Sequence, residues 1–514
     1  MPLGRIWRVR SADFEAILAV PFRVLVRVPS WIVPPGTETR DNPRRHTNQQ
    51  ETGYCASRIL GEPISLIMET GDRTIWMDLH LNQNIGRFVF PGLLNSRGSQ
   101  SLVLIVVLLA SLSVNCRNSP RTESANPKNM DTTPKDETDR NDPLAIHRRA
   151  TVVDMHADTT QRLVDENVDL SQRLADGHLD AVRAKEGGLD AQFFSIWVEP
   201  ELFGAGGARA MKRADVQIEA VRELTQKHPE TWELATTAAD VRRISGSGKI
   251  AALMGMEGGY AIDEKIENVE RYYQMGVRYL SPAWSVSTSW AGSSGDEAGK
   301  TRGLNDFGKQ VIREMNRLGI MVDVSHLSDK AFWDIVNTST RPVIATHSGC
   351  RAITDVPRNL TDDMIVALAK TGGVVNVIFY PEHIEPGYSA RKKQVDAEIA
   401  SLVQQASEAE KGDVAHKKLA RDRVRAREYL KRLPPVSVAR IVDHIDHIVK
   451  LVGIDHVGIG SDFDGIQAVP ADLKSIADLP SLTKELLRRG YSESDIDKIL
   501  GGNMLRVMEA TEKK

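Results

Sequence analysis

Residues 320–349 read IMVDVSHLSDKAFWDIVNTSTRPVIATHSG, and two short apolar runs within them each end in a histidine, His326 and His347. Short apolar runs that alternate with longer amphipathic stretches are typical of parallel strands joined by helices. In a barrel of parallel strands the functional side chains lie at the carboxyl ends of the strands. We therefore expect both histidines to lie at the same end of one sheet.

The same alternation extends over residues 145–514, which we interpret as one domain. The apolar runs that predict strands are 151–155, 191–198, 250–256, 277–280, 320–325, 342–346, 373–379 and 456–461. Helical patterns lie between several of them, at 208–227, 265–275, 303–318 and 362–370. Eight β–α units predict an α/β fold, a (β/α)8 barrel of the TIM type. A doubly wound open sheet is the alternative architecture.

A charged, alanine-rich segment at 381–435 follows the seventh predicted strand. It predicts one or two helices inserted into the barrel after that strand. The simplest interpretation is a solvated helical surface. Because the βα loops of a barrel surround its active site, a lid over the barrel mouth is the functional alternative.

The composition excludes several classes of protein. The 514 residues include 66 Lys and Arg against 69 Asp and Glu, which leaves a net charge of −3. This balance, with 41% hydrophobic residues, is that of an ordinary globular protein and not of a general nucleic-acid binder. Three cysteines, Cys55, Cys116 and Cys350, are too few for a disulfide scaffold, and we expect Cys350 to be a reduced structural thiol.

The first hundred residues differ from the rest of the chain. No lysine precedes Lys128, arginine is frequent, and apolar runs are broken by Pro and Gly without a sustained period. We interpret residues 1–100 as a poorly structured extension. A wrongly assigned translation start, with Met77 as the true start, is one explanation of this segment, and a genuine extension of the protein is the other.

An apolar segment, SLVLIVVLLASLSVNC, occupies residues 101–116. Its continuous apolar part is shorter than the roughly 20 residues of a membrane-spanning helix and fits the core of an export signal. Cys116 directly after it resembles a bacterial lipoprotein processing site, although a short buried strand or helix is the alternative. Residues 117–144 are polar and predict a linker. The expected location is therefore outside the cytoplasm, periplasmic or anchored to a membrane through a lipid on Cys116.

Side chains that can bind metals end five of the predicted strands. They are His156 and Asp158 after the first strand, Glu257 after the third, His326 after the fifth, His347 after the sixth and Asp462 after the eighth. One such side chain is usually structural, but packing alone does not explain six at the same end of one barrel. Imidazole with carboxylate ligation suits zinc, while manganese and iron are alternatives.

The spacing suggests two metal ions. His156 and Asp158 face the same way in an extended backbone and can bind one ion, and His326 and His347 can bind a second. The carboxylate of Glu257 could bridge the two. Two ions about 3.5–4 Å apart can hold a bridging hydroxide that attacks a polarised carbonyl. A further carboxylate would then move the proton, either Asp462 or the neighbouring Asp464.

These residues lie in motifs that resemble the membrane dipeptidase (renal dipeptidase-like) family, zinc peptidases of the amidohydrolase superfamily. The matching stretches, over about 142–509, are DMHADT, HLDAVRAKEGGLDAQFFSIWV, GMEGGYAI, RYLSPAW, GLNDFGKQVIREMNRLGIMVDVSH, VIATHSG, RNLTDD, VNVIFY and GIGSDFDG. The resemblance implies a homodimeric barrel with two zinc ions per chain that cleaves dipeptides. It assigns His156 and Asp158 to one zinc, His326 and His347 to the other, and Glu257 to both.

The resemblance also implies roles for four further residues. Asp462 matches the aspartate that transfers the proton, and Arg358 matches the arginine that binds the terminal carboxylate of the substrate, a group that suits its planar fork. Without the resemblance Arg358 would be interpreted as a surface-loop residue. Tyr380 matches a tyrosine of the substrate pocket, and a rim aromatic is its alternative. Trp284 stands where the family has a histidine that contacts the substrate carbonyl; it could donate one hydrogen bond or only close the pocket wall.

The leading hypothesis is an exported zinc dipeptidase in which Asp462 transfers the proton. One alternative is an amidohydrolase that acts on N-acyl amino acids or β-lactams. The other is a catalytically weakened metal-binding homologue, an interpretation that only Trp284 supports.

Overall fold

The computed structural model describes residues 6–8, 23–27, 64–70, 73–79 and 142–512. The first four ranges are strands β1 (Ile6–Arg8), β2 (Arg23–Arg27), β3 (Ile64–Thr70) and β4 (Arg73–Leu79), which pair antiparallel in chain order. No periodicity in the sequence had predicted this sheet. The apolar segment 101–116, Cys116 and residues 117–141 of the proposed linker lie outside the described residues.

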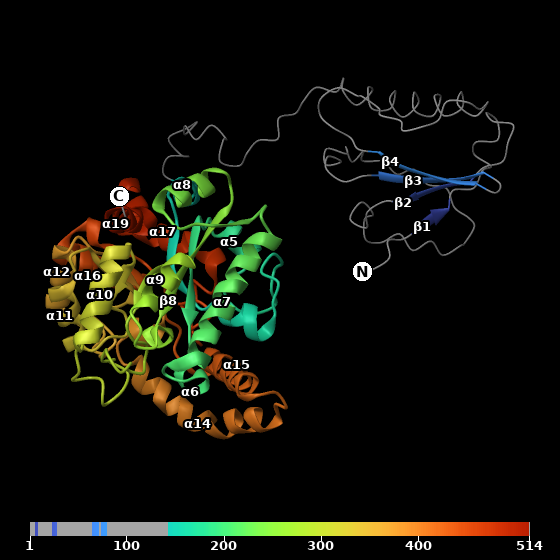
Figure 1. The fold of residues 1–514 in the computed structure, drawn as a ribbon. Helices are drawn as coiled ribbons and strands as arrows, with labels where there is room; N and C mark the ends of the chain where they lie inside the picture. The colour runs from blue at the N-terminus through green and yellow to red at the C-terminus, as the bar shows by residue number, and fades with distance from the viewer. Residues whose placement is uncertain (1–5, 9–22, 28–63, 71–72, 80–141, 513–514) are drawn as a thin grey trace. The chain divides into compact units, whose positions relative to one another are not determined.

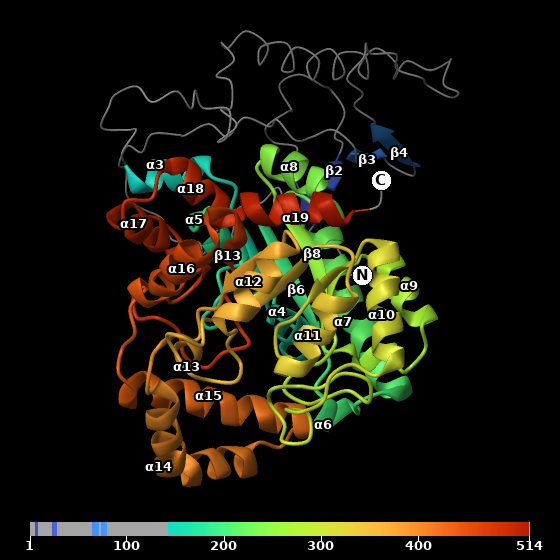
Figure 2. The same cartoon turned by 90° about the vertical axis from the view of Figure 1, so that its left-hand side faces the viewer.

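Eight parallel strands form a nearly closed barrel in residues 142–512 (Figures 1 and 2). They are β5 (Val153–Ala157), β6 (Ala191–Trp197), β8 (Ile250–Glu257), β9 (Val277–Ser281), β10 (Met321–Asp323), β11 (Val343–Ser348), β12 (Val375–Val377) and β13 (Val457–Ile459). Neighbours pair in that order, and the first and last strands meet through a bridge between Ala157 and Phe463. Each corresponds to one of the eight strands that the sequence predicts, which confirms the barrel.

The helices of the barrel lie between the strands. Their bounds are α3 (Pro143–Arg149), α4 (Thr159–Gln161), α5 (Ala181–Glu186), α6 (Pro200–Phe203), α7 (Gly207–Lys227), α8 (Ala238–Gly246), α9 (Glu267–Gln274), α10 (Asp306–Leu318), α11 (Asp329–Thr338), α12 (Asp362–Lys370), α16 (Ala439–Val452), α17 (Pro480–Arg488), α18 (Glu493–Asp497) and α19 (Asn503–Thr511). Helix α10 begins later than its pattern predicts because the Asn305 side chain caps it by accepting the Gly308 N–H. It ends at Gly319, whose φ of 89° suits glycine.

The inserted segment after β12 is helical, as predicted. It consists of α13 (Pro381–Ile384), α14 (Tyr388–Ala409) and α15 (Val414–Arg432). Figures 1 and 2 both show α14 and α15 at the opposite end of the barrel from α8 and α19. Among the described residues no helix is both long and apolar enough to cross a membrane.

The strands separate two regions of apolar packing. Alternate residues such as Val153, Met155, Phe193 and Leu253 form a cluster inside the barrel, which residues of α8 and α19 join. The intervening residues of the strands pack with the outer helices. This alternation follows from the period of two in a strand, and it fills the barrel with side chains. The interior is therefore a packed core, which holds the strand ends rigidly in place.

The sequence did not predict β7 (Trp232–Leu234). This short strand pairs with β8 and is not one of the eight strands of the barrel.

One buried histidine gives the fold a predictable pH dependence. In α16, His444 Nδ1 accepts the Cys350 N–H at 2.9 Å, and its Nε2 lies 3.1 Å from the Ile384 carbonyl. Burial lowers the pKa of His444 from 6.5 to about 4. Because this pKa is lower in the folded state, the neutral ring stabilises the fold fully above pH 6.5, and that contribution is lost as the pH falls toward 4.

We expect His444→Gln, whose amide can form both hydrogen bonds, to weaken this dependence. Between pH 6.5 and 4 the unfolding free energy of the unchanged protein should fall by about 3 kcal/mol more than that of the variant. Urea unfolding at a series of pH values measures the difference. Equal pH slopes for the two proteins would contradict the assignment.

Candidate active site

The five predicted ligands converge at the carboxyl ends of the barrel strands. His156 lies in β5, Glu257 is the last residue of β8 and His347 lies in β11. Asp158 directly follows β5, and His326 lies three residues after the end of β10. All five are buried, and each is less than 10% exposed. The barrel brings together in one place side chains that are up to 191 positions apart in the sequence.

The Glu257 carboxylate lies at the centre of this cluster. Its Oε1 is 2.7 Å from His326 Nε2 and 3.4 Å from His347 Nε2, and its Oε2 is 3.3 Å from His156 Nε2. The two halves of the cluster share this residue: His156, Asp158 and Glu257 form one group of ligand atoms, and Glu257, His326 and His347 form another. A carboxylate whose two oxygens face different imidazoles has the arrangement of a bridging ligand.

The residues fit a metal centre because buried ligand atoms have no other partner. His156 Nε2 and Asp158 Oδ1 are fully buried, and neither makes a hydrogen bond within the described part of the chain. His156 Nε2 also lies 3.8 Å from Asp158 Oδ2, close enough for both to bind one cation. Buried polar atoms are normally satisfied, so such atoms at convergent positions need an external partner. Imidazoles combined with carboxylates form a donor set that suits zinc.

Hydrogen bonds behind the imidazoles hold their Nε2 atoms toward the cluster. His156 Nδ1 lies 2.7 Å from the hydroxyl of Tyr279. Thr346 Oγ1 donates to Asp323 at 2.8 Å and lies 2.8 Å from His347 Nδ1, so it accepts the Nδ1–H of that ring. Such partners fix the tautomer and the orientation of a metal-binding histidine.

The sequence analysis did not identify the residues of this supporting layer. Tyr279 lies within the strand RYLS and Thr346 directly precedes His347, yet both look like ordinary strand residues. Tyr279 comes from β9, which does not pair with β5, so the closure of the barrel brings its hydroxyl to His156. Thr346 lies beside His347 in β11, and Asp323 of the neighbouring β10 orients its hydroxyl. A threonine directly before a strand-end histidine is a weak signal that could have suggested one of them.

We expect Tyr279→Phe to weaken metal binding by about 10- to 100-fold, because it removes the hydrogen-bond partner of His156 Nδ1 and leaves the ring in place. Competition with a chelator of known affinity measures the change. Tyr272→Phe removes a buried hydroxyl from α9 and is the matched control, which should bind metal like the unchanged protein. Equal affinity in both variants would show that Tyr279 does not support the ligand.

Two residues of the site have backbone conformations that only glycine adopts easily. His326 has a φ of 71° and Asp462 has a φ of 62°. A non-glycine residue in this region costs about 1–3 kcal/mol, and such residues cluster at active sites. The backbone therefore turns sharply at the two positions where a side chain has to point into the barrel mouth.

The charges favour the metal-binding protonation states of Glu257 and His326 but not that of His156: burial lowers the pKa of His156, and the neighbouring Tyr279 and Glu257 outweigh burial and raise that pKa well above its usual value. Burial alone would raise the pKa of Glu257, but His156 and His326 outweigh it and hold that pKa well below its usual value. Burial lowers the pKa of His326 to about 4, and Arg358 acts in the same direction. An ionised carboxylate and a neutral imidazole are the forms that coordinate a cation.

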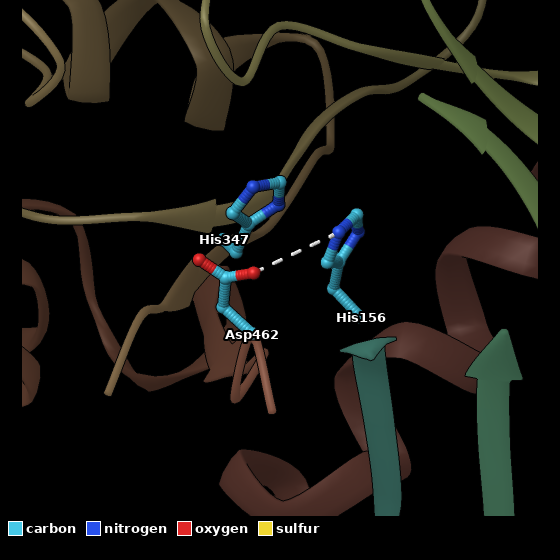
Figure 3. A group of neighbouring side chains, drawn as sticks. All are labelled: His156, His347 and Asp462. Atoms are coloured by element: carbon cyan, nitrogen blue, oxygen red, sulfur yellow. Dashed lines mark ion pairs between the residues drawn. The ribbon is translucent and has the colours of Figure 1, made fainter. Parts of the chain in front are cut away.

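The structure separates the two candidate proton carriers. Asp462 Oδ1 lies 4.0 Å from His156 Nε2, and His156, His347 and Asp462 point toward one another in Figure 3. Burial, opposed by His156, raises the pKa of Asp462 well above its usual value. Asp464 is not part of this group, and its carboxylate accepts hydrogen bonds from the hydroxyl of Thr159 and the N–H of His178. Asp464 therefore connects loops, while Asp462 faces the ligands.

The three predicted substrate contacts are placed differently. The Arg358 guanidinium donates to Ser348 Oγ and to the His347 carbonyl, both at 2.9 Å, and its Nε is buried without a partner in the described chain. Tyr380 packs edge-on against His383 with the ring centres 5.1 Å apart, and it does not line the cavity described next. Trp284 does line that cavity, 6.2 Å from the His326 ring between centroids.

A cavity of about 770 Å³ leads to the cluster. Asp158, Glu257, His326 and Asp462 line its inner part. Its wall includes Lys418, Leu419, Asp422, Arg423, Ala426 and Arg427 of α15. The inserted helix therefore covers the barrel mouth, in the position that a lid requires, and Arg423 contacts Glu166 at 2.8 Å across the cavity wall.

A (β/α)8 barrel with histidines and carboxylates converging around one glutamate at its strand ends defines a metal-dependent hydrolase. The chain belongs to the membrane dipeptidase family, peptidase family M19: residues 141–514 match the model of that family.

Comparisons with individual proteins agree with this assignment. Dipeptidase 3 of Rattus norvegicus is 30% identical over 339 residues, which are 64% of this chain and 58% of the rat protein. The chain thus spans less than two thirds of that relative. The crystal structure of the probable dipeptidase PvdM from Pseudomonas aeruginosa has a TM-score of 0.61 and 27% identity, covering 73% of this chain and 98% of that one. A metallopeptidase from Rhodobacter sphaeroides, solved with a phosphinate mimic of the dipeptide L-Ala-D-Ala, has a TM-score of 0.57 and 26% identity over 70% and 99% of the two chains.

Proposed function

We propose that this protein is a dipeptidase with two zinc ions per chain. The observation that carries the proposal is the position of the Glu257 carboxylate, which lies between His156 on one side and His326 and His347 on the other. Its family supports the reaction type, and the R. sphaeroides relative solved with a dipeptide mimic supports the substrate class. When bound, the ions would supply Lewis acidity that activates water and polarises the scissile carbonyl.

The residues of the chain divide the remaining work. His156 and Asp158 would hold one ion, His326 and His347 the other, and Glu257 both. Asp462, beside the ligands, would take the proton from the attacking water and deliver it to the leaving amine. The half-buried guanidinium of Arg358, which donates to the His347 carbonyl, would bind the terminal carboxylate of the substrate.

Metal analysis combined with a dipeptide panel tests this proposal. We expect close to two zinc ions per chain and hydrolysis of L,L- or L,D-dipeptides. Stoichiometric zinc without turnover of any dipeptide would contradict the proposal. The same panel, extended to N-acyl amino acids and a β-lactam, tests the alternative amidohydrolase activity and distinguishes it from dipeptide hydrolysis.

Trp284 favours a second candidate, a homologue with weakened catalysis. Its ring packs edge-on against Trp197, with centroids 4.8 Å apart, and forms part of the cavity wall. A tryptophan can donate one hydrogen bond but does not exchange protons near neutral pH. Low turnover of every dipeptide by the zinc-loaded protein, with faster turnover in Trp284→His, would favour this candidate.

We also propose that the protein is exported, on the basis of the apolar segment 101–116, and that Cys116 carries a lipid anchor. Fractionation of cells that produce the full chain tests the location. Cys116→Ser should release the protein from the membrane fraction, and recovery of both forms in the cytoplasm would contradict export.

The homodimer that the family resemblance implies is tested by light scattering of the purified protein.

A further inference from the structure

Glu199 has a buried carboxylate oxygen that the metal cluster does not use. The residue follows β6, directly before α6, and is 6% exposed. Its side chain lines the 770 Å³ cavity, and its Oε2 makes no hydrogen bond within the described residues. Burial raises the pKa of Glu199, as expected for a carboxyl group that has lost water without gaining a close partner. An unpaired acceptor in a cavity wall is a position for a donor on a ligand.

The surroundings of Glu199 suit a positively charged donor. The ammonium of Lys418, on α15, lies 4.0 Å from Glu199 Oε2 and 5.7 Å from the centre of the Trp197 ring. The first distance is that of a long ion pair and exceeds that of a hydrogen bond, so Glu199 Oε2 still has no hydrogen-bond donor among the described residues. Trp197 and Glu199, two positions apart, both face the cavity, and an aromatic face attracts a cation.

This position is separated from the metal ligands by a pair of aromatic rings. The Trp197 ring lies 4.8 Å from the Trp284 ring, which lies 6.2 Å from the ring of His326, each measured between centroids. A ligand group bound at Glu199 therefore does not itself contact the metal ligands. Such contacts select substrates without taking part in the chemistry.

We propose that Glu199 binds a primary ammonium group of the substrate, with the face of Trp197 beside it. This makes Glu199 a residue that determines specificity, and the inference rests on the proposed dipeptidase function. A dipeptide offers such a group in two places: the α-ammonium at its N-terminus and the side chain of a lysine-like first residue. Substrates that are acylated at the relevant nitrogen would be disfavoured, because they leave the carboxylate buried and unpaired.

Binding of phosphinate dipeptide mimics to the zinc-loaded full chain, measured by calorimetry, tests the inference. One pair consists of the L-Ala-D-Ala mimic and its analogue without the amino group. The second pair consists of the L-Lys-D-Ala and L-norleucine-D-Ala mimics. The unchanged protein should prefer the charged member of at least one pair by about 10- to 100-fold, the contribution of a hydrogen bond to a charged group. Glu199→Gln should bring that ratio close to one.

The two sources of the ammonium group give different results. Loss of preference in the first pair identifies the α-ammonium, and loss in the second pair alone identifies the side chain; either result supports the inference. If Glu199→Gln changes the affinity of all four mimics by the same factor, Glu199 only holds α15 in place through Lys418 and the inference is wrong. It is also wrong if the variant changes none of them, or if the unchanged protein binds no mimic.

Two further variants keep the test specific. Glu201→Gln lies on the same helix at an exposed position outside the cavity wall, and its binding ratios should match those of the unchanged protein. Lys418→Gln should retain the preference for the charged mimic, since it removes only the neighbouring cation. Dipeptide hydrolysis is measured separately. If the protein hydrolyses dipeptides but Glu199→Gln leaves the binding ratios unchanged, this inference alone is wrong. If the binding ratios depend on Glu199 but no dipeptide is hydrolysed, the proposed function alone is wrong.

Discussion

Glu257→Gln is expected to lose metal and activity together, by about 10³-fold or more in kcat/KM. The substitution keeps the shape of the side chain but replaces one carboxylate oxygen with an amide nitrogen, which has no lone pair for a cation. Both oxygens of Glu257 face imidazole nitrogens of the cluster, within 2.7–3.4 Å. Under the proposed function, the stabilisation lost would be that of both ions at once, several kcal/mol of transition-state energy.

Elemental analysis and dipeptide turnover on the same preparation measure this effect. Glu233→Gln is the matched control, because Glu233 lies in β7 and pairs with Arg243 and Lys249 instead of the cluster. We expect the control to keep both its zinc and its activity. A Glu257→Gln protein with two ions per chain and normal turnover would show that this residue is not a shared ligand.

Asp462→Asn is expected to lower kcat by about 10²–10⁴-fold while the zinc content stays unchanged. The reason is that an amide cannot accept the proton from the attacking water, whereas the five proposed ligands are all still present. Asp462 Oδ1 lies 4.0 Å from His156 Nε2, whereas Glu257 Oε2 lies 3.3 Å from the same nitrogen. The change should appear in kcat more than in KM.

Asp464→Asn provides the comparison, because the two aspartates are two positions apart and the sequence could not choose between them. The contacts of Asp464 with Thr159 and His178 predict a lower melting temperature for its variant and a kcat close to normal once folded. If zinc is lost together with activity in Asp462→Asn, Asp462 is a ligand and the assigned role is wrong. A larger kcat effect in Asp464→Asn would reverse the two assignments.

Much of the barrel could be predicted because its signals are local. The strands are short apolar runs, and those that carry His156, Glu257 and His347 are buried on both faces and end at or just after these polar side chains. Parallel topology then places all these ends on one side. For this reason the convergence of His156, Glu257 and His347 could be expected before any coordinates existed. The ends of helices were less accurate, since they depend on caps such as Asn305.

The supporting and selective parts of the site could not be predicted in this way. The hydroxyl of Tyr279 reaches His156 from another strand, and Asp323 of the neighbouring strand orients the hydroxyl of Thr346, so no periodicity within one strand reveals these contacts. The unpaired oxygen of Glu199 is likewise a property of what surrounds it. The same carboxylate on an open loop would be solvated and unremarkable.

The sequence by itself determined the barrel, the metal-binding character of its strand ends and the family, because the spacing of apolar residues and the types of the polar residues can be read directly from the linear sequence. Only the tertiary structure decided which aspartate faces the ligands, how α15 closes the cavity and which buried carboxylate oxygen has no hydrogen-bond donor. These depend on distances between segments far apart in the sequence. Burial and pairing, which set the energy of each polar group, exist only after the chain has folded.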